Sequence, residues 1–153
     1  KYGNIYDHFS FDYDYPGGYK SLGTNAQIEG ISGKVCSTIA GSKGHAYIWR
    51  DQGWLVNEKG RYRYEGSTDG DQPMHKAMCE GIRKGEPVNQ GRVLGEATMT
   101  GIIGRMSAYT GKSVEWKWAM EQSKLDLTPE RELSFDGPFP IAPVRLPGQT
   151  ELV

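Results

Sequence analysis

The strongest constraint on the fold is a change in the spacing of apolar residues near residue 66. Before that point, apolar and polar residues alternate along short runs separated by glycine-rich turns, which is typical of half-buried β-strands. After it, apolar residues recur every three to four positions, as they do on an amphipathic α-helix. Strands followed by helices predict an α+β domain, in which two to three helices lie on one face of an open, largely antiparallel sheet.

Residues 4–15 form the clearest predicted strand, with a mainly aromatic side and a polar side. The first side carries Ile5, Phe9, Phe11, Tyr13 and Tyr15, interrupted by Asp7, and the second carries Tyr6, His8, Ser10, Asp12 and Asp14. Pro16-Gly17-Gly18 then supplies a turn, because proline fixes φ and glycine tolerates positive φ. Residues 19–28 alternate again, so the two runs predict an antiparallel hairpin. We expect Asn25 and Gln27 to share its polar face with Tyr6 and His8.

The rest of the chain predicts four more strands, three helices and a tail. The strands are expected at 34–40, 45–49, 54–56 and 61–65, and the helices at 71–84, 91–109 and 114–123, the last with Ser113 as N-cap. The long helix has an expected buried stripe of Val93, Ala97, Gly101, Gly104 and Ala108. Each interior glycine costs roughly 0.5–1 kcal/mol relative to alanine, so this helix should approach a neighbour closely. Residues 125–153 hold five of the eight prolines and predict an extended strap.

The composition argues against several classes of protein. The 153 residues contain 18 Lys and Arg against 19 Asp and Glu, a formal net charge of −1, so the basic stripe of nucleic-acid binders is not expected. No apolar run approaches the roughly 20 residues that cross a bilayer, so no membrane span is expected. Cys36 and Cys79 are too few for a disulfide framework or a zinc site. We expect reduced thiols, with one bridge as the alternative.

Few residues stand in a spacing typical of catalysis. The three histidines lack the H-x-x-H and H-E-x-x-H spacings of metal sites, and no dinucleotide fingerprint or phosphate loop occurs. Histidines of this kind are more often surface or capping residues, and aromatic residues more often pack than bind sugars. His8 is the best functional candidate, because an open sheet face that carries Tyr, His, Asn and Gln suits hydroxyl-rich ligands.

Five segments follow one another in a distinctive order. They are GNIYDHFSFDYDYPGG, GSKGHAYIW, HKAMCEGIRKGEPVN, EATMTGIIGRMSAYTGKSVEW and SKLDLTPE. This succession, from about Gly3 to Pro147, resembles the C-terminal part of Gfo/Idh/MocA-family oxidoreductases, which include glucose–fructose oxidoreductase and inositol dehydrogenase. The combination of the glycine turn with I-R-K-G-E-P and T-M-T-G-I-I-G-R-M-S-A-Y-T-G carries most of the resemblance.

The resemblance implies that the chain is a single C-terminal domain, 1–153, of a longer two-domain enzyme. An N-terminal Rossmann domain would hold NAD or NADP, and this domain would contact a sugar or polyol substrate and form a homo-oligomer through its sheet. The family's catalytic lysine, in an E-K-P motif, has no counterpart here, so we expect the chain alone to bind no dinucleotide and to be inactive. By the same matching, Tyr6, His8, Asn25, Gln27 and His75 are the candidate substrate-binding residues.

Two alternatives stay open at this level: a free-standing carbohydrate-binding module, and a purely structural dimerisation domain that has lost its catalytic partner. The same aromatic residues are compatible with a free-standing carbohydrate-binding module. The family's Arg-Gln-x-Pro-Gly segment is replaced here by Ala26-Gln27-Ile28-Glu29-Gly30, which changes the expected substrate contacts. Because the chain starts on a strand at Lys1, we expect it to be cut from a longer protein, and neither a cytoplasmic nor an exported location is favoured.

Overall fold

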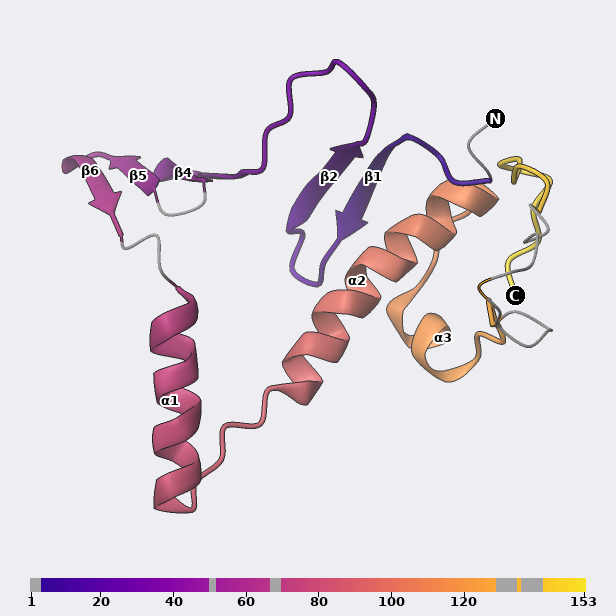
Figure 1. Ribbon diagram of the computed structural model, residues 1–153. Coiled ribbons are helices and arrows are strands. Elements are labelled where there is room, and N and C mark those ends of the chain that lie inside the picture. Colours follow the sequence, from indigo (N-terminus) through magenta and orange to yellow (C-terminus); the bar gives the residue numbers. More distant parts are fainter. Residues whose placement is uncertain (1–3, 50–51, 67–69, 129–134, 136–141) are drawn as a thin grey trace. The chain divides into compact units, whose positions relative to one another are not determined.

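The computed structural model of the chain describes residues 4–49, 52–66, 70–128, 135 and 142–153. Within these residues lie six strands, all paired antiparallel, and three helices, so the predicted α+β class with open sheets is confirmed (Figure 1). The chain divides into two compact units, one formed by Lys1–Gly30 with Gly91–Val153 and the other by Ile31–Gln90. Each unit is described by itself below.

The first unit is a two-stranded hairpin packed on a long helix. Strands β1 (His8–Asp14) and β2 (Lys20–Ala26) pair antiparallel, and helix α2 (Gly91–Thr110) lies against β1 (Figure 1). The most buried apolar side chains are Ile103, Met106 and Tyr109 of α2, together with Ala119 of the short helix α3 (Trp116–Glu121). The core of this unit is therefore built around the C-terminal half of α2.

The aromatic side of β1 faces α2, as the alternation predicts. Phe9, Phe11 and Tyr13 are half-buried, whereas the residues between them are exposed. At Gly104 a Cβ atom would lie 2.6 Å from the Tyr13 hydroxyl and 3.0 Å from the Phe11 ring. The Tyr13 hydroxyl also donates a 2.8 Å hydrogen bond to the carbonyl of Thr100. The expected close approach of the glycine-rich helix is confirmed at Gly104.

The expected buried stripe of α2 is otherwise wrong. The buried residues of the helix are Ile103, Gly104, Met106, Tyr109 and Thr110. Val93 is 65% exposed, and nothing lies within 4 Å of a Cβ built at Gly95 or Gly101. The reason is that the aromatic residues of β1 contact α2 between Thr100 and Tyr109. A helical period shows which residues share a face, but not how far along the helix a neighbour extends.

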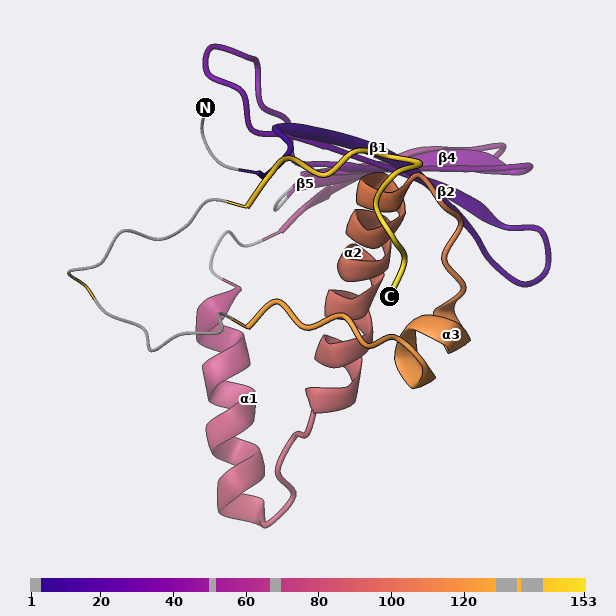
Figure 2. The same cartoon turned by 90° about the vertical axis from the view of Figure 1, so that its right-hand side faces the viewer.

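The C-terminal segment returns to the end of α2. The Gly148 N–H donates to the Thr110 carbonyl at 2.7 Å, and the Ser123 hydroxyl donates to the Val153 carbonyl at 2.8 Å. Figure 2 shows this segment, in yellow, crossing the C-terminal end of α2. The extended strap stays a prediction, because Pro129, Pro138 and Pro140 lie outside the described residues.

Helix α3 is shorter than predicted. It begins at Trp116 and ends at Glu121, with Glu115 rather than Ser113 at the N-cap position. Glu115 has an extended backbone (φ −80°, ψ 138°) and makes no side-chain capping bond. Ser113 and Val114 therefore stay in the loop that joins α2 to α3.

The second unit holds a four-stranded sheet and one helix. Strands β3 (Ser37–Gly41), β4 (Gly44–Trp49), β5 (Gln52–Asn57) and β6 (Gly60–Glu65) pair in chain order, followed by α1 (Asp71–Lys84). The six strands thus form two sheets rather than the single sheet expected. Gly30 has a positive φ of 81°, and residues 31–36 join no strand, so β2 and β3 do not pair.

The register of the second sheet separates an apolar face from a mixed one. Ile48 lies opposite Gly53, and Leu55 lies opposite both Ala46 and Tyr62. The face that these residues share is here called the apolar sheet face, and it consists of Ile39, Ala46, Ile48, Leu55, Tyr62 and Tyr64. All of them except Ala46 are exposed in the isolated chain.

The Gly104 contact yields a matched pair of substitutions. Gly104→Ala should lower the free energy of unfolding by about 1–3 kcal/mol, because the new methyl group overpacks the contact with Phe11 and Tyr13. Gly101→Ala, three residues earlier on the same helix, meets open space and should raise it by roughly 0.5–1 kcal/mol through helix propensity. Urea denaturation followed by circular dichroism measures both. Equal effects would contradict the close approach.

Candidate functional site

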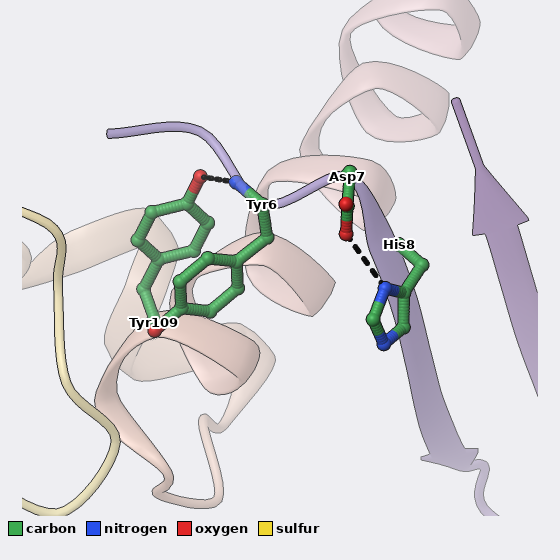
Figure 3. A network of polar contacts seen from close by, with 4 residues as sticks. All are labelled: Tyr6, Asp7, His8 and Tyr109. Carbon is green, nitrogen blue, oxygen red and sulfur yellow. Dashed lines mark hydrogen bonds and ion pairs between the residues drawn. The ribbon is translucent and has the colours of Figure 1, made fainter. Parts of the chain in front are cut away.

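An aromatic cluster fixes the start of the hairpin on α2. The Tyr6 and Tyr109 rings stack with centroids 4.4 Å apart and planes 13° apart, and the Tyr6 N–H donates to the Tyr109 hydroxyl oxygen at 3.1 Å (Figure 3). The Phe9 ring lies 5.8 Å from Tyr109, and the Arg105 guanidinium lies 4.7 Å from the centroid of the same ring. Tyr109 therefore joins the N-terminal segment, β1 and α2 at one point.

Tyr6 is a packing residue here and does not lie on the exposed polar face, so that part of the expectation is wrong. Its hydroxyl donates to the Arg145 carbonyl, and its ring is covered by Tyr109. The chain bends at Asp7, and β1 begins only at His8. The bend interrupts the alternation, so Tyr6 falls on the same side as Phe9.

His8 does lie on the exposed polar face. Its side chain is 72% exposed, and Nδ1 lies 2.7 Å from the Asp7 carboxylate (Figure 3). This contact orients the imidazole ring, because a carboxylate partner favours the proton on Nδ1. Among the described residues no partner is found for Nε2, so this nitrogen is available to accept a hydrogen bond from a ligand hydroxyl.

Asn25 and Gln27 do not share the face of His8. The register places His8 opposite Ala26 and Asn25 opposite Phe9, so Asn25 lies on the side that faces α2. Gln27 comes two residues later, and its N–H donates to the Asp7 carbonyl at 2.7 Å. The expected common polar face of Tyr6, His8, Asn25 and Gln27 is therefore not formed, although both amides remain exposed.

His75 belongs to the other unit. It lies in α1 and is exposed. The other four candidates all belong to the first unit.

The register defines a different polar surface, here called the open face. It consists of His8, Ser10, Asp12 and Asp14 from β1, with Lys20, Leu22, Thr24 and Ala26 from β2. All eight residues are exposed. Lys20 Nζ lies 2.7 Å from the Asp14 carboxylate, and this hydrogen bond, with the charges of Asp14 and Asp12, raises the pKa of Lys20. The open face therefore presents both donors and acceptors to solvent.

A hollow lies on the opposite side of β1 from the open face, and the sequence did not indicate it. It measures about 620 Å³ and lies between β1 with its turn, α2 and the start of α3. Burial, followed by the neighbouring Tyr15, raises the pKa of the Tyr13 phenol. Ser107, Ser113, Glu115 and Trp116 also line the hollow. Their only sequence signal was proximity to the helix end at Gly111, which is common in loops.

The described residues hold no group of three or more His, Cys, Asp or Glu side chains arranged to bind a metal ion. Both cysteines are free thiols, as expected. In the described part of the chain, no helix combines the length and hydropathy needed to cross a membrane.

Comparison with known proteins adds no assignment. No family model matches the chain, and no curated protein or solved structure matches it significantly.

The role of Tyr109 can be measured by substitution. Tyr109→Phe removes the acceptor for the Tyr6 N–H and should lower the free energy of unfolding by about 1 kcal/mol, whereas Tyr109→Ala also removes the stacked ring and should lower it by about 3–5 kcal/mol. Tyr19→Phe is the control, because the Tyr19 ring is exposed and its hydroxyl has no bond among the described residues. Chemical denaturation of the three variants gives the comparison. A Tyr19 variant as unstable as the Tyr109 variants would contradict the cluster's role.

Proposed function

We propose that this chain is the substrate-contacting and assembly part of an NAD(P)-dependent oxidoreductase that acts on a sugar, a polyol or a related hydroxyl compound. The observation that carries the proposal is the open face, a solvent-exposed polar surface on a strand whose other side is held rigidly by aromatic packing. The ordered succession of strands and helices, which resembles Gfo/Idh/MocA oxidoreductases, supports the same function.

The side chains of the open face suit a hydroxyl-rich ligand. The carboxylates of Asp12 and Asp14 accept hydrogen bonds from hydroxyl groups, Lys20 donates them, and His8 Nε2 accepts one more. In the proposed enzyme, a nucleotide-binding domain on the same polypeptide would hold NAD or NADP, which would supply the hydride acceptor for oxidation of a carbon that bears a hydroxyl group, and the hydroxyl proton would pass to a base of that domain. The open face orients the substrate for that transfer, and the hydride chemistry belongs to the cofactor.

A free-standing carbohydrate-binding module is less well supported. Such a module needs aromatic rings with a free face for a sugar. Tyr47 and Trp54 stack on each other with centroids 4.4 Å apart. Lys34 lies 4.8 Å from the Tyr47 ring and Arg61 lies 5.6 Å from the Trp54 ring. Each ring of this stacked pair therefore already has a cation against it.

The first experiment addresses the oxidoreductase itself. The complete reading frame that contains this sequence should also encode a strand, a glycine-rich turn and an E-K-P motif, and its purified product should reduce NAD⁺ or NADP⁺ with a member of a sugar and polyol panel. In that product, His8→Ala should lower kcat/KM at least about tenfold, a loss of about 1.4 kcal/mol of transition-state binding. His45→Ala, an exposed histidine of the other unit, is the control.

Isothermal calorimetry on the present chain should detect no dinucleotide binding. Micromolar NAD⁺ binding to it would contradict the proposal.

The assembly role is assigned to the apolar sheet face. Isolated exposed apolar residues are common, but a contiguous apolar face on a sheet marks an interaction surface. A second copy is the simplest occupant, because two identical flat faces related by a twofold axis are self-complementary. Leu55 stands on β5, one of the two central strands, opposite Ala46 and Tyr62.

Sedimentation velocity tests this assembly. At micromolar concentration the wild-type chain should sediment as a dimer or larger species rather than as a 17.0 kDa monomer. Leu55→Lys should shift it to monomer, because two charges would then be buried against each other. Thr38→Lys, an exposed position on the other face of the same sheet opposite Tyr47, should leave assembly unchanged. A wild-type monomer would refute the assignment.

A further inference from the structure

The hollow on the far side of β1 is a formed groove with its own chemistry. Its floor is apolar and consists of Phe11, Tyr13, Ile103 and Gly104. Because Gly104 lacks a side chain, the Phe11 and Tyr13 side chains pack directly against the backbone of α2. The hydrogen bond from Tyr13 to Thr100 holds one of these rings in place. The groove therefore lies beside the close contact between β1 and α2.

Two aromatic side chains rise beside this floor. Tyr15 is 47% exposed and Trp116 is 43% exposed, and both line the groove. They come from different elements, the end of β1 and the start of α3, so the fold brings them together although they are 101 positions apart. Exposed aromatic surface at a groove is suited to stacking against the C–H face of a ring.

Three polar side chains of the groove, those of Ser107, Ser113 and Glu115, make no hydrogen bond or ion pair among the described residues. The Glu115 carboxylate is exposed and makes no side-chain bond to the helix that it precedes. Among the described residues no hydrogen bond or ion pair is found for it, nor for the hydroxyls of Ser107 and Ser113. The other two carboxylates near the groove belong to Asp12 and Asp14, whose side chains point to the open face. Glu115 is thus a lining carboxylate without a hydrogen bond or ion pair among the described residues, whereas Asp14 is paired with Lys20.

We propose that this groove binds one ring of a sugar or cyclic polyol, with Glu115 as the principal hydrogen-bond acceptor and Trp116 as the stacking surface. Ser107 and Ser113 complete the polar contacts. An apolar floor with a few convergent polar groups is the usual composition of a small-molecule site, and 620 Å³ falls within the usual range of roughly 300–1,000 Å³. This assignment rests on the proposed function for the class of ligand, but places a subsite on the opposite side of β1 from the open face.

The test is a titration of the whole chain with myo-inositol, monitored by two-dimensional amide NMR. The NMR signals of the Trp116 indole N–H and of the backbone amides of Ser107, Ser113 and Glu115 should shift together. The dissociation constant should be in the millimolar range, which corresponds to a binding free energy of about −4 kcal/mol. Glu115→Gln, which keeps the shape of the side chain, should raise this constant at least about fivefold, and Trp116→Ala at least about tenfold. Glu121→Gln, an exposed position of the same helix outside the groove, should leave it unchanged.

Each other outcome overturns the subsite. An absence of shifts in the groove at about 100 mM myo-inositol would exclude affinity of the expected order. An unchanged dissociation constant in Glu115→Gln would show that the Glu115 carboxylate does not bind the ligand. This result would hold even if Trp116→Ala perturbs α3. Shifts confined to the open face would refute the groove while leaving the proposed function intact. Conversely, failure of the proposed function appears as an inactive full-length product, whatever the titration gives.

Discussion

The packing of the aromatic side of β1 on α2 is the contact on which the first unit depends. An isolated two-stranded hairpin is at best marginally stable in water, so β1 and β2 need a surface to cover one face. Gly104 supplies that surface by letting the Phe11 ring and the Tyr13 hydroxyl approach the helix backbone. Tyr109 extends the contact to Tyr6 and Phe9, one turn further along the helix.

This one-sided packing explains why the hairpin has two different polar surfaces. The side away from α2 is left in water, and its residues form the open face. The side toward α2 is covered only along part of its length, and the uncovered part, bounded by α3, is the groove. Both surfaces include residues of β1, and β1 is held on α2 by the packing of its aromatic side chains. Preorganised positions of this kind are what substrate orientation requires.

The second unit shows a related imbalance. Its four strands pair completely with one another, but the apolar sheet face and the apolar side of α1, with Met74, Met78 and Ile82, are exposed in the single chain. The two central strands are paired on both sides, whereas β3 and β6 each have a partner on one side only. The exposed apolar sheet face is the feature on which the proposed assembly rests.

Local patterns were sufficient to predict most elements. Alternation located all six strands within a few residues, and the helical period with the flanking prolines and glycines located α1 and α2. The same reasoning placed Phe9, Phe11 and Tyr13 on the packed side and His8 on the wet side. It went wrong with Tyr6, because a single bend at Asp7 exchanges the two sides of a strand. It went wrong with Asn25, because the face of a second strand depends on its register with the first, and a shift of one residue exchanges every side chain.

The sequence by itself determined the α+β class, the order of the elements and the aromatic character of β1, because these follow from spacing and turn chemistry between near neighbours. Only the tertiary structure decided that the strands divide into two sheets, that Tyr6 stacks on Tyr109, and that Trp116 and Glu115 join Tyr15 around one groove. Several of these features join residues about a hundred positions apart. Such contacts arise from the packing of the chain, and the spacing of neighbouring residues carries no information about them.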